Sequence, residues 1–354
     1  MRRALLGLTL ASLPLIATAA PLERLTPVTD FLDLGSIRPD PIESIRLEQG
    51  RWSWSITQSY MNQWSLTWHP HRVHIDRGLD RQPISADEWR YIEEAFPEDD
   101  VYMIDLEGWR TDLTLSYGLP HGMTLTAEIP YVDVGGGPNW DSIAEDFHAT
   151  VDENRTFGRD TFPKGQSVFY LRANGRTTSV PDASTSGIGD ATLSLSMPIG
   201  NVAKEQSLVF AIQPPTGDEE TVLGSGGWDA SLSWYRKWRG ERRSYLAGAG
   251  FSYLDSSGSM MGFERSNTYH LLGEVTQRVT KNVDVRLGVR ADSATLADEL
   301  SDSDLGDPAF FWRLGMTYDL PRGNSLYFDI GEELVPQTGT EADWSVHFGF
   351  SAAR

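Results

Sequence analysis

The sequence contains no cysteine, so it can form neither a disulfide nor a thiolate metal site. Basic residues are also scarce, because 30 Lys and Arg oppose 50 Asp and Glu, which gives a formal net charge of −20. A chain this acidic repels nucleic acid, so we expect no nucleic-acid partner. The acids either keep surface loops solvated or attract cations and basic solutes.

Long apolar runs are missing as well. The first residues combine the basic Arg2 and Arg3, the apolar stretch Ala4–Ile16 and the Ala-x-Ala sequence Ala17–Ala19. This arrangement predicts a secretory signal peptide over residues 1–19. A membrane-anchor helix is the alternative, but the stretch is shorter than the about 20 residues that a spanning helix needs. No later run approaches that length, so a mature chain in a membrane would have to cross it with strands.

The clearest structural pattern in the sequence is an alternation of apolar and polar residues. From Trp52 to Trp68 the even positions are mostly aromatic or aliphatic, and the odd positions are mostly small and polar. Period 2 over this length predicts one strand far longer than the about 5–6 residues of ordinary strands. The pattern recurs near 102–117, 123–131, 191–199, 208–212, 228–234, 245–253, 269–279, 283–289, 310–318, 326–330 and 344–350.

The second of these segments changes parity along its length. Tyr102, Ile104 and Leu106 are apolar at even positions, whereas the apolar positions after Gly108 are odd, beginning with Trp109. One inserted residue would account for such a change, so we expect a β-bulge near Gly108.

The links between the segments alternate in length. Short links fall at Leu119–Gly122, Gly200–Glu205, Arg239–Arg242, Thr280–Asn282 and Pro321–Gly323, and the others, such as 69–100 and 135–185, are mostly longer. Short turns at one end and long loops at the other are typical of transmembrane barrels. The predicted fold is therefore all-β, an antiparallel up-and-down transmembrane barrel of about 12 strands, with 10 to 14 as the range, and both termini in the periplasm.

The polar face of these segments carries charges of both signs. A barrel that is charged inside and apolar outside suits a lipid environment. A soluble β-sandwich would also alternate, but it does not explain such long strands with charged inner faces. The residues expected to line the lumen are Arg110, Glu128, Asp190, Glu274, Arg278, Arg286, Arg290, Arg313, Asp329 and His347.

Two regions lie outside this pattern. Residues 20–50 either hang in the periplasm or form a small plug, before a barrel domain that spans 51–354. The long extracellular loop 135–185 is expected to carry structure, because loops of this length seldom lack it. Within it, Trp140–Val151 has helical spacing, and Asn174-Gly175 predicts a hairpin turn between two short strands above the membrane.

Several short motifs then point to a family. They are Glu128–Tyr131, Gly135–Gly137, Asp141–Ile143, Asp146–His148, Gly158–Arg159 and Ser186–Leu193. Together they resemble an uncharacterised Gram-negative outer-membrane β-barrel family, a domain of unknown function. That family is loosely similar to porin-like proteins of aromatic-degradation pathways. The resemblance covers most of the chain after about Gly35.

The resemblance implies an outer-membrane location in a Gram-negative cell, reached by export through the inner membrane. The partners that follow are outer-membrane lipid, lipopolysaccharide and the barrel-assembly machinery. It supplies no reaction, cofactor or ligand. Within the family-like loop, Asp146, Phe147, His148 and Arg159 either constrict the pore and contact solute or simply pack the loop.

Acidic loops offer one possible metal site. Asp298–Asp304 with Asp307 has oxygen ligands at alternating positions, which suits a hard cation such as Ca²⁺, although the spacing does not match an EF-hand. One alternative is a loop whose acids are simply solvated. Another is that these acids bridge through divalent ions to lipopolysaccharide phosphates. We expect no resident cofactor and no dedicated metal site, with loop-bound Ca²⁺ as the exception left open.

Catalysis is not expected. His270 and His347 have inward parity near several serines, but small polar residues line any lumen, and no nucleophile-elbow or zinc-protease motif is found. The favoured function is a narrow, porin-like channel for small polar or aromatic solutes. The mixed inner charges either coat a solute path or pair with one another and close it. The alternatives are a structural or adhesive surface barrel with a closed lumen and, third, a membrane-embedded hydrolase.

Overall fold

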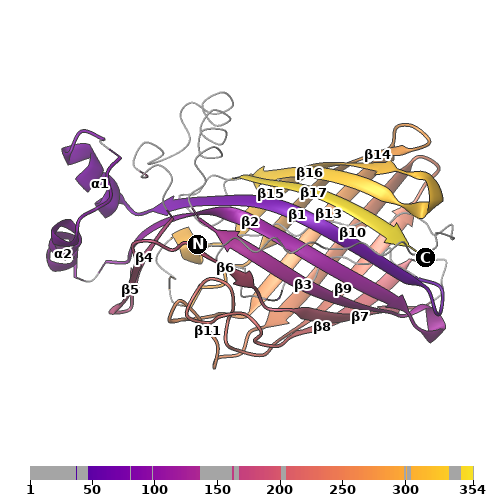
Figure 1. Ribbon diagram of the computed structural model, residues 1–354, viewed down its shortest axis with the longest axis horizontal. Coiled ribbons are helices and arrows are strands. Elements are labelled where there is room, and N and C mark those ends of the chain that lie inside the picture. The colour runs from indigo at the N-terminus through magenta and orange to yellow at the C-terminus, as the bar shows by residue number, and fades with distance from the viewer. Residues whose placement is uncertain are drawn as a thin grey trace, which may run out of the picture.

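The sheet of this protein closes on itself. The computed structural model describes residues 37, 47–79, 81–97, 99–135, 162, 167–200, 205–298, 300, 304–334 and 344–353. Within them 12 antiparallel strands form the barrel, and β17 pairs with β1 to close the ring (Figure 1). In order around the barrel they are β1 (Trp52–Leu66), β2 (Val101–Gly118), β3 (Thr124–Val134), β7 (Thr192–Pro198), β8 (Gln206–Gln213), β9 (Asp229–Arg239), β10 (Arg243–Tyr253), β13 (Thr268–Arg278), β14 (Val283–Asp292), β15 (Ala309–Asp319), β16 (Ser325–Glu333) and β17 (Trp344–Ala353).

The predicted fold class and strand number are therefore confirmed. The remaining elements decorate the barrel: α1 (Trp68–Asp76), α2 (Ala86–Ala95), β4 (Val168–Ala173), β5 (Arg176–Val180), β6 (Thr185–Ile188), the pair β11 (Ser259–Met260) and β12 (Phe263–Glu264), and three 3₁₀ turns at Pro120–Gly122, Asp304–Gly306 and Pro321–Gly323. None of the described helices is both long enough and apolar enough to cross a membrane.

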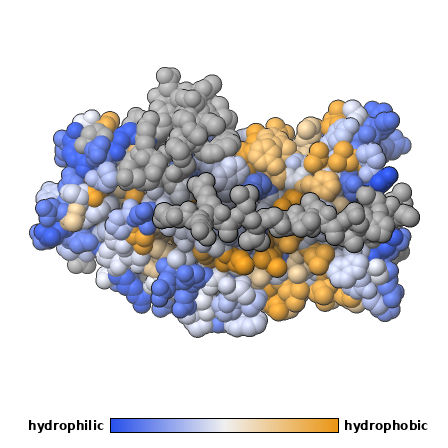
Figure 2. All heavy atoms as spheres, in the orientation of Figure 1, coloured by the Kyte–Doolittle hydropathy of each residue, from blue (hydrophilic) through white to orange (hydrophobic). Residues whose placement is uncertain are grey.

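Outward-facing apolar side chains form a belt around the barrel. Leu113, Leu287 and Leu314 are each 42–51% exposed, although they lie in the middle of their strands. Figure 2 shows apolar residues gathered over the strands, with hydrophilic residues at both ends. Such a surface would aggregate in water but is solvated by lipid, so the alternation read from the sequence does mark a lipid-facing wall.

Tight turns occupy one end of the barrel, called here the short-turn end. Two of them share a Leu-Pro-x-Gly sequence, at Leu119–Gly122 and Leu320–Gly323. In both, the residue before the glycine has a left-handed backbone, with φ of 61° at His121 and 70° at Arg322. The long links lie at the opposite end, the long-loop end, as predicted.

The bulge expected near Gly108 is absent, and that prediction is wrong. The β1–β2 register is continuous from Trp52 opposite Tyr117 to Leu66 opposite Met103. Tyr102 and Leu106 therefore point inward, on the same face as the charged residues further down the strand. They are apolar because this end of the lumen contains a packed apolar cluster. Along β2 the inward-facing side chains therefore change from apolar to polar, while the same parity keeps facing inward.

The link 69–100 is not irregular, because it contains α1 and α2, which the alternation of apolar and polar residues does not predict. The missed signal is a capping box: the Ser85 hydroxyl accepts from the Glu88 N–H, and the Glu88 carboxylate accepts from the Ser85 N–H. Arg77 adds two hydrogen bonds to that carboxylate, at 3.1 and 3.2 Å. These contacts fix where α2 begins.

The hairpin predicted around Asn174-Gly175 is confirmed as β4–β5. Both turn residues have positive φ, which is the geometry that tight hairpins favour. β4 pairs with β2 beyond the end of β3, with Tyr170 opposite Met103, so the sheet continues past the barrel (Figure 1). The predicted signal peptide and the helix predicted over Trp140–Val151 lie outside the described residues.

The lipid-facing wall makes a direct prediction. Replacing Leu287 with Arg should cost about 2–4 kcal/mol of folding free energy in lipid vesicles, because a charge near the middle of the belt must be buried in hydrocarbon. Tyr91→Arg is the control, since Tyr91 is 63% exposed on α2, outside the barrel wall. Urea unfolding in vesicles measures both, and equal costs would contradict a lipid-facing position for Leu287.

Candidate functional site in the barrel lumen

Small polar side chains cover much of the inner wall. On β1 the inward residues of the short-turn half are Ser53, Ser55, Thr57 and Ser59, all nearly fully buried. Serine and threonine recur on the inner faces of the neighbouring strands, for example at Ser116 and Thr126, whose hydroxyls are hydrogen-bonded at 2.8 Å. Such short side chains give this part of the wall a polar lining.

Charged side chains on the inner wall meet over glycines. Arg286 on β14, Gly315 on β15 and Asp329 on β16 lie in register on adjacent strands. The Arg286 guanidinium donates from one nitrogen to both Asp329 oxygens, at 2.9 and 3.0 Å. A Cβ at Gly315 would collide with the Asp329 carboxylate. The missing side chain is thus what lets the ion pair lie flat on the wall.

The same arrangement, which we call a glycine saddle, recurs on other strands. Thr57 and Tyr327 flank Gly349 in register, and their hydroxyls are hydrogen-bonded across it. Ser233 and His270 flank Gly250 in the same way, with 3.4 Å between Oγ and Nε2. In each case the two side chains lie on the two strands that flank the glycine's strand. They approach each other because the glycine between them carries no side chain.

Other ion pairs of the inner wall join residues of one strand or of two adjacent strands. Arg110 contacts Asp112 on its own strand at 2.7 Å and Glu128 on β3 at 3.1 Å. Arg278 at the short-turn end binds both oxygens of Asp284, each at 2.6 Å. These pairs run along the wall.

Three further predicted residues line the same wall. Arg290 on β14 pairs with Asp292 on that strand at 2.6 Å. Glu274 on β13 accepts from the Thr276 hydroxyl at 3.0 Å. Arg313 on β15 is buried and has inward parity.

Asp190 lies inside the barrel but serves as an anchor for a loop. Its two carboxylate oxygens accept from the backbone N–H groups of Thr216, Gly217 and Ser225, at 2.7–2.8 Å, and from the Ser225 hydroxyl. The carboxylate therefore ties the β8–β9 link to the wall, rather than presenting a charge to a solute.

His347 contacts a serine closely. Its Nδ1 lies 2.7 Å from the Ser59 Oγ, the separation that a nucleophile and its base require. Both side chains are nearly fully buried, and within the described residues the other ring nitrogen has no hydrogen-bond partner to orient it. The geometry fits hydrogen bonding within the wall better than hydrolysis.

A packed apolar cluster fills the lumen at the long-loop end. Its members are at most 8% exposed and come from strands and loops alike. Strands contribute Met61, Tyr102, Ile104, Leu106, Val132, Val134, Phe169, Leu171, Ala173 and Phe263, and the links between strands contribute Ala183, Val222, Leu223, Met261, Leu296, Leu300 and Leu305. We call this set the mouth cluster. It lies at the long-loop end of the polar inner wall.

Described residues that precede β1 also touch the inner wall. Ile37 packs with Ala211 and Leu254, and its carbonyl accepts from the inward-facing Ser252 hydroxyl at 2.7 Å. Leu47 donates from its N–H to Thr124 near the short-turn end, at 3.4 Å. Ile37 therefore lies inside the barrel, and a plug made by residues 20–50 as a whole stays a prediction.

Some buried charges were missed from the sequence. Arg265 and Asp229 form a fully buried bidentate pair, at 2.6 and 2.9 Å, that joins the loop before β13 to the start of β9. Lys237 is buried on the inner face near the other end of β9. The predicted strand stopped at residue 234, whereas β9 continues to Arg239, and extending its parity would have found Lys237.

The loop candidates Asp146, Phe147, His148 and Arg159 lie outside the described residues. Within the described part of the chain no three acidic or histidine side chains come together as a metal site. The acidic loop 298–307 falls partly outside that part, so loop-bound Ca²⁺ stays a prediction.

A closed sheet with lipid-facing side chains outside and ion pairs inside defines an outer-membrane β-barrel. A solved structure with this fold is the COG4313 outer membrane channel from Pseudomonas putida F1, with 12% identity over 90% of this chain and 100% of that one, at a TM-score of 0.53. The Pseudomonas putida toluene transporter TodX has 11% identity over 91% and 92% of the two chains, at a TM-score of 0.39. The first likeness establishes the fold alone.

The family itself comes from the sequence. The model of a protein family of unknown function, DUF3187, matches residues 30–353. The chain therefore belongs to the DUF3187 family, in agreement with the resemblance seen in its motifs. No curated protein matches the sequence.

The glycine saddle makes a second prediction. Gly315→Ala should destabilise the barrel by about 1–3 kcal/mol, because the new methyl group displaces the Asp329 carboxylate from Arg286. Gly273→Ala is the matched control, since a Cβ on that glycine would meet only Val289, at an ordinary 3.9 Å. Urea unfolding in vesicles compares the two variants, and a loss for Gly315→Ala no larger than the control's would contradict the saddle.

Proposed function

We propose that this protein is an outer-membrane channel for small polar or aromatic solutes. The observation that carries the proposal is the direction of the inner-wall ion pairs. Arg286–Asp329 and Arg278–Asp284 lie along the wall, held there by in-register contacts, so that opposite charges are neutralised without spanning the lumen. A charged but locally neutral wall suits a path for small solutes.

The size of the barrel supports the same function. Eight-stranded barrels are filled by their own side chains, and porins with 16 strands hold a wide aqueous channel. A barrel of 12 strands lies between them. The inner faces of β1, β2 and β3 carry serine and threonine side chains, which take up less of the interior than large side chains would.

A second candidate, a structural or adhesive barrel with a closed lumen, is favoured by the mouth cluster. Apolar residues packed to core-like burial would stop water and ions at the extracellular end. In the proposed channel this cluster acts as the gate, since leucines outside the barrel strands such as Leu296 and Leu305 can leave it without unfolding a strand. The predicted lipid, lipopolysaccharide and assembly-machinery partners belong to either candidate.

Planar-bilayer conductance of the purified barrel separates the two candidates. We expect small, well-resolved openings for the wild type and larger or more frequent openings for the double variant Leu296→Ser, Leu305→Ser, because its gate packs less tightly. Leu334→Ser is the control, since this leucine is 47% exposed at the end of β16. Heat-modifiable gel migration checks that each barrel is folded.

Absence of openings in both the wild type and the double variant over a wide voltage range would overturn the channel and favour the closed barrel. Equal conductance of the double variant and the wild type would show instead that the mouth cluster is not the gate.

A further inference from the structure

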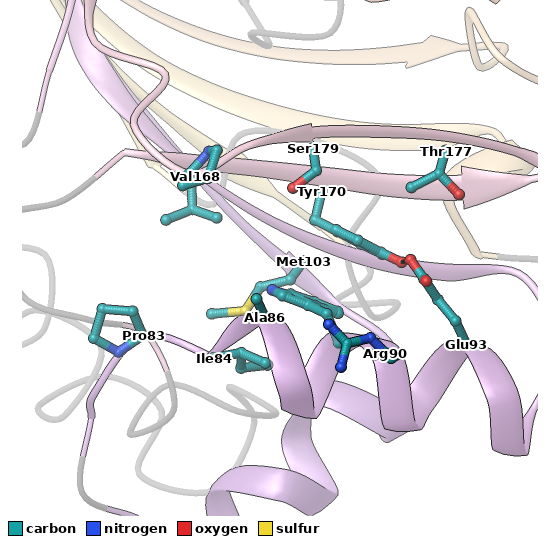
Figure 3. A pocket seen from close by; sticks show the side chains of 12 residues that line it. Pro83, Ile84, Ala86, Arg90, Glu93, Met103, Val168, Tyr170, Thr177 and Ser179 are labelled. Carbon is teal, nitrogen blue, oxygen red and sulfur yellow. Dashed lines mark hydrogen bonds between the residues drawn. The ribbon is translucent and has the colours of Figure 1, made fainter.

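A pocket lies on the outer side of the sheet extension, between α2 and the β4–β5 hairpin. Its volume is about 520 Å³, within the range of about 300–1,000 Å³ that small-molecule sites occupy. Figure 3 shows α2 on one side, with the strands that carry Met103, Tyr170 and Ser179 on the other. The pocket is separate from the lumen, because Met103 and Tyr170 face away from the mouth cluster and pack in a different apolar cluster.

The inner surface of the pocket is apolar and aromatic. Ile84, Met103 and Tyr170 are almost fully buried there. The rings of Trp89 and Tyr170 are stacked, with centroids 3.7 Å apart and planes within 8°. Stacked rings and a methionine thioether form a rigid, polarisable surface that favours another aromatic ring.

A few polar groups complete the pocket. The Tyr170 hydroxyl donates to the Glu93 carboxylate at 2.8 Å, which holds its ring in place (Figure 3). Burial and the neighbouring Glu93 raise the pKa of Tyr170, so it keeps this proton at any physiological pH. The hydroxyls of Thr177 and Ser179 lie at the exposed rim, where they can hydrogen-bond a polar substituent.

The charges at the pocket are already engaged. Glu93 accepts from Tyr170, and Arg90 on the same helix donates to Asp87 at 3.0 Å. Because one lining residue is basic and one is acidic, their charges largely cancel, and the pocket has little net charge that would attract an ion. The chemistry therefore selects a neutral ligand.

We propose that this pocket binds a small neutral molecule that carries one aromatic ring. An apolar cavity of about 150 Å³ holds benzene, so this pocket has room for a ring with a polar substituent. The inference goes beyond the proposed channel, since the site lies outside the lumen and past the apolar belt. On the cell surface it would hold the solute close to the barrel mouth.

The probe for the test is 4-fluorobenzyl alcohol, followed by ¹⁹F NMR line width with the full barrel in lipid nanodiscs. We expect saturable broadening by the wild type. Ala86→Trp should weaken binding by about tenfold or more, because the new ring fills the pocket from α2. This variant adds a side chain at an exposed helix position, so it tests occupancy without removing a packed residue.

Matched controls separate the pocket from the lipid and from other aromatics. Trp68→Ala removes an aromatic that is 52% exposed on α1, away from the pocket residues, and should leave binding unchanged. Trp89→Ala removes half of the stacked pair and should weaken binding. Heat-modifiable migration and the unfolding midpoint confirm that each variant is folded.

Two further probes test the ligand class. Cyclohexylmethanol should compete poorly, because it lacks the ring face, and 4-fluorobenzylamine should bind more weakly than the alcohol, because it is a cation. Unchanged binding by Ala86→Trp, or no saturable binding at all, would overturn the site. Equal competition by cyclohexylmethanol, or tighter binding of the amine, would overturn the aromatic neutral class. Since no arm measures conduction, a barrel that fails to conduct would leave this proposal standing.

Discussion

Every strand of this barrel obeys one constraint: at membrane depth the backbone must satisfy its own hydrogen bonds, and every second side chain must face hydrocarbon. The closed ring of 12 strands answers the first requirement, because β17 returns to β1 and leaves no open edge. The second produces the period-2 pattern, with leucines such as Leu287 and Leu314 exposed outside and charges held within. The fold class, the inward residues and the turn positions all follow from it.

Inside the barrel, the glycine saddles decide what the charges can do. If the middle one of three neighbouring strands carried a large side chain between two charged ones, the charged side chains would have to point toward the barrel axis. With Gly315 between them, Arg286 and Asp329 bond sideways and stay on the wall. Gly250 and Gly349 do the same for polar pairs. The central lumen is thus lined by neutralised charges, while the mouth cluster packs apolar side chains together at the long-loop end.

The sequence was sufficient for the parts that depend on local periodicity. The fold class, the number of strands and the β4–β5 hairpin are confirmed, since each depends on neighbouring residues. Local periodicity was not sufficient where the inward-facing side of one strand changes from polar to apolar along its length. The opposite parity of Tyr102 and Ile104 predicts a bulge near Gly108, whereas the strand is continuous and both residues point into the mouth cluster, to which distant loops contribute. The helices α1 and α2 were overlooked, although the Ser85–Glu88 capping box was readable.

Pairing in the lumen was beyond the sequence for a different reason. Arg286 and Asp329 were both assigned to the lumen, but their contact depends on the relative register of β14, β15 and β16, which no local pattern fixes. The role of Asp190 as a loop anchor likewise depends on residues that are distant in sequence. Surface features such as the pocket beside Trp89 require the packing of a helix against a hairpin far along the chain.

The central claim, that odd positions of β14 face lipid and even positions face the lumen, can be measured directly because the chain has no cysteine of its own. Single cysteines at positions 285 to 289 would each carry a nitroxide label in a lipid-reconstituted barrel. Collisions with lipid-dissolved oxygen should be frequent at Val285, Leu287 and Val289 and rare at Arg286 and Gly288. Similar oxygen accessibility at both parities would contradict the account.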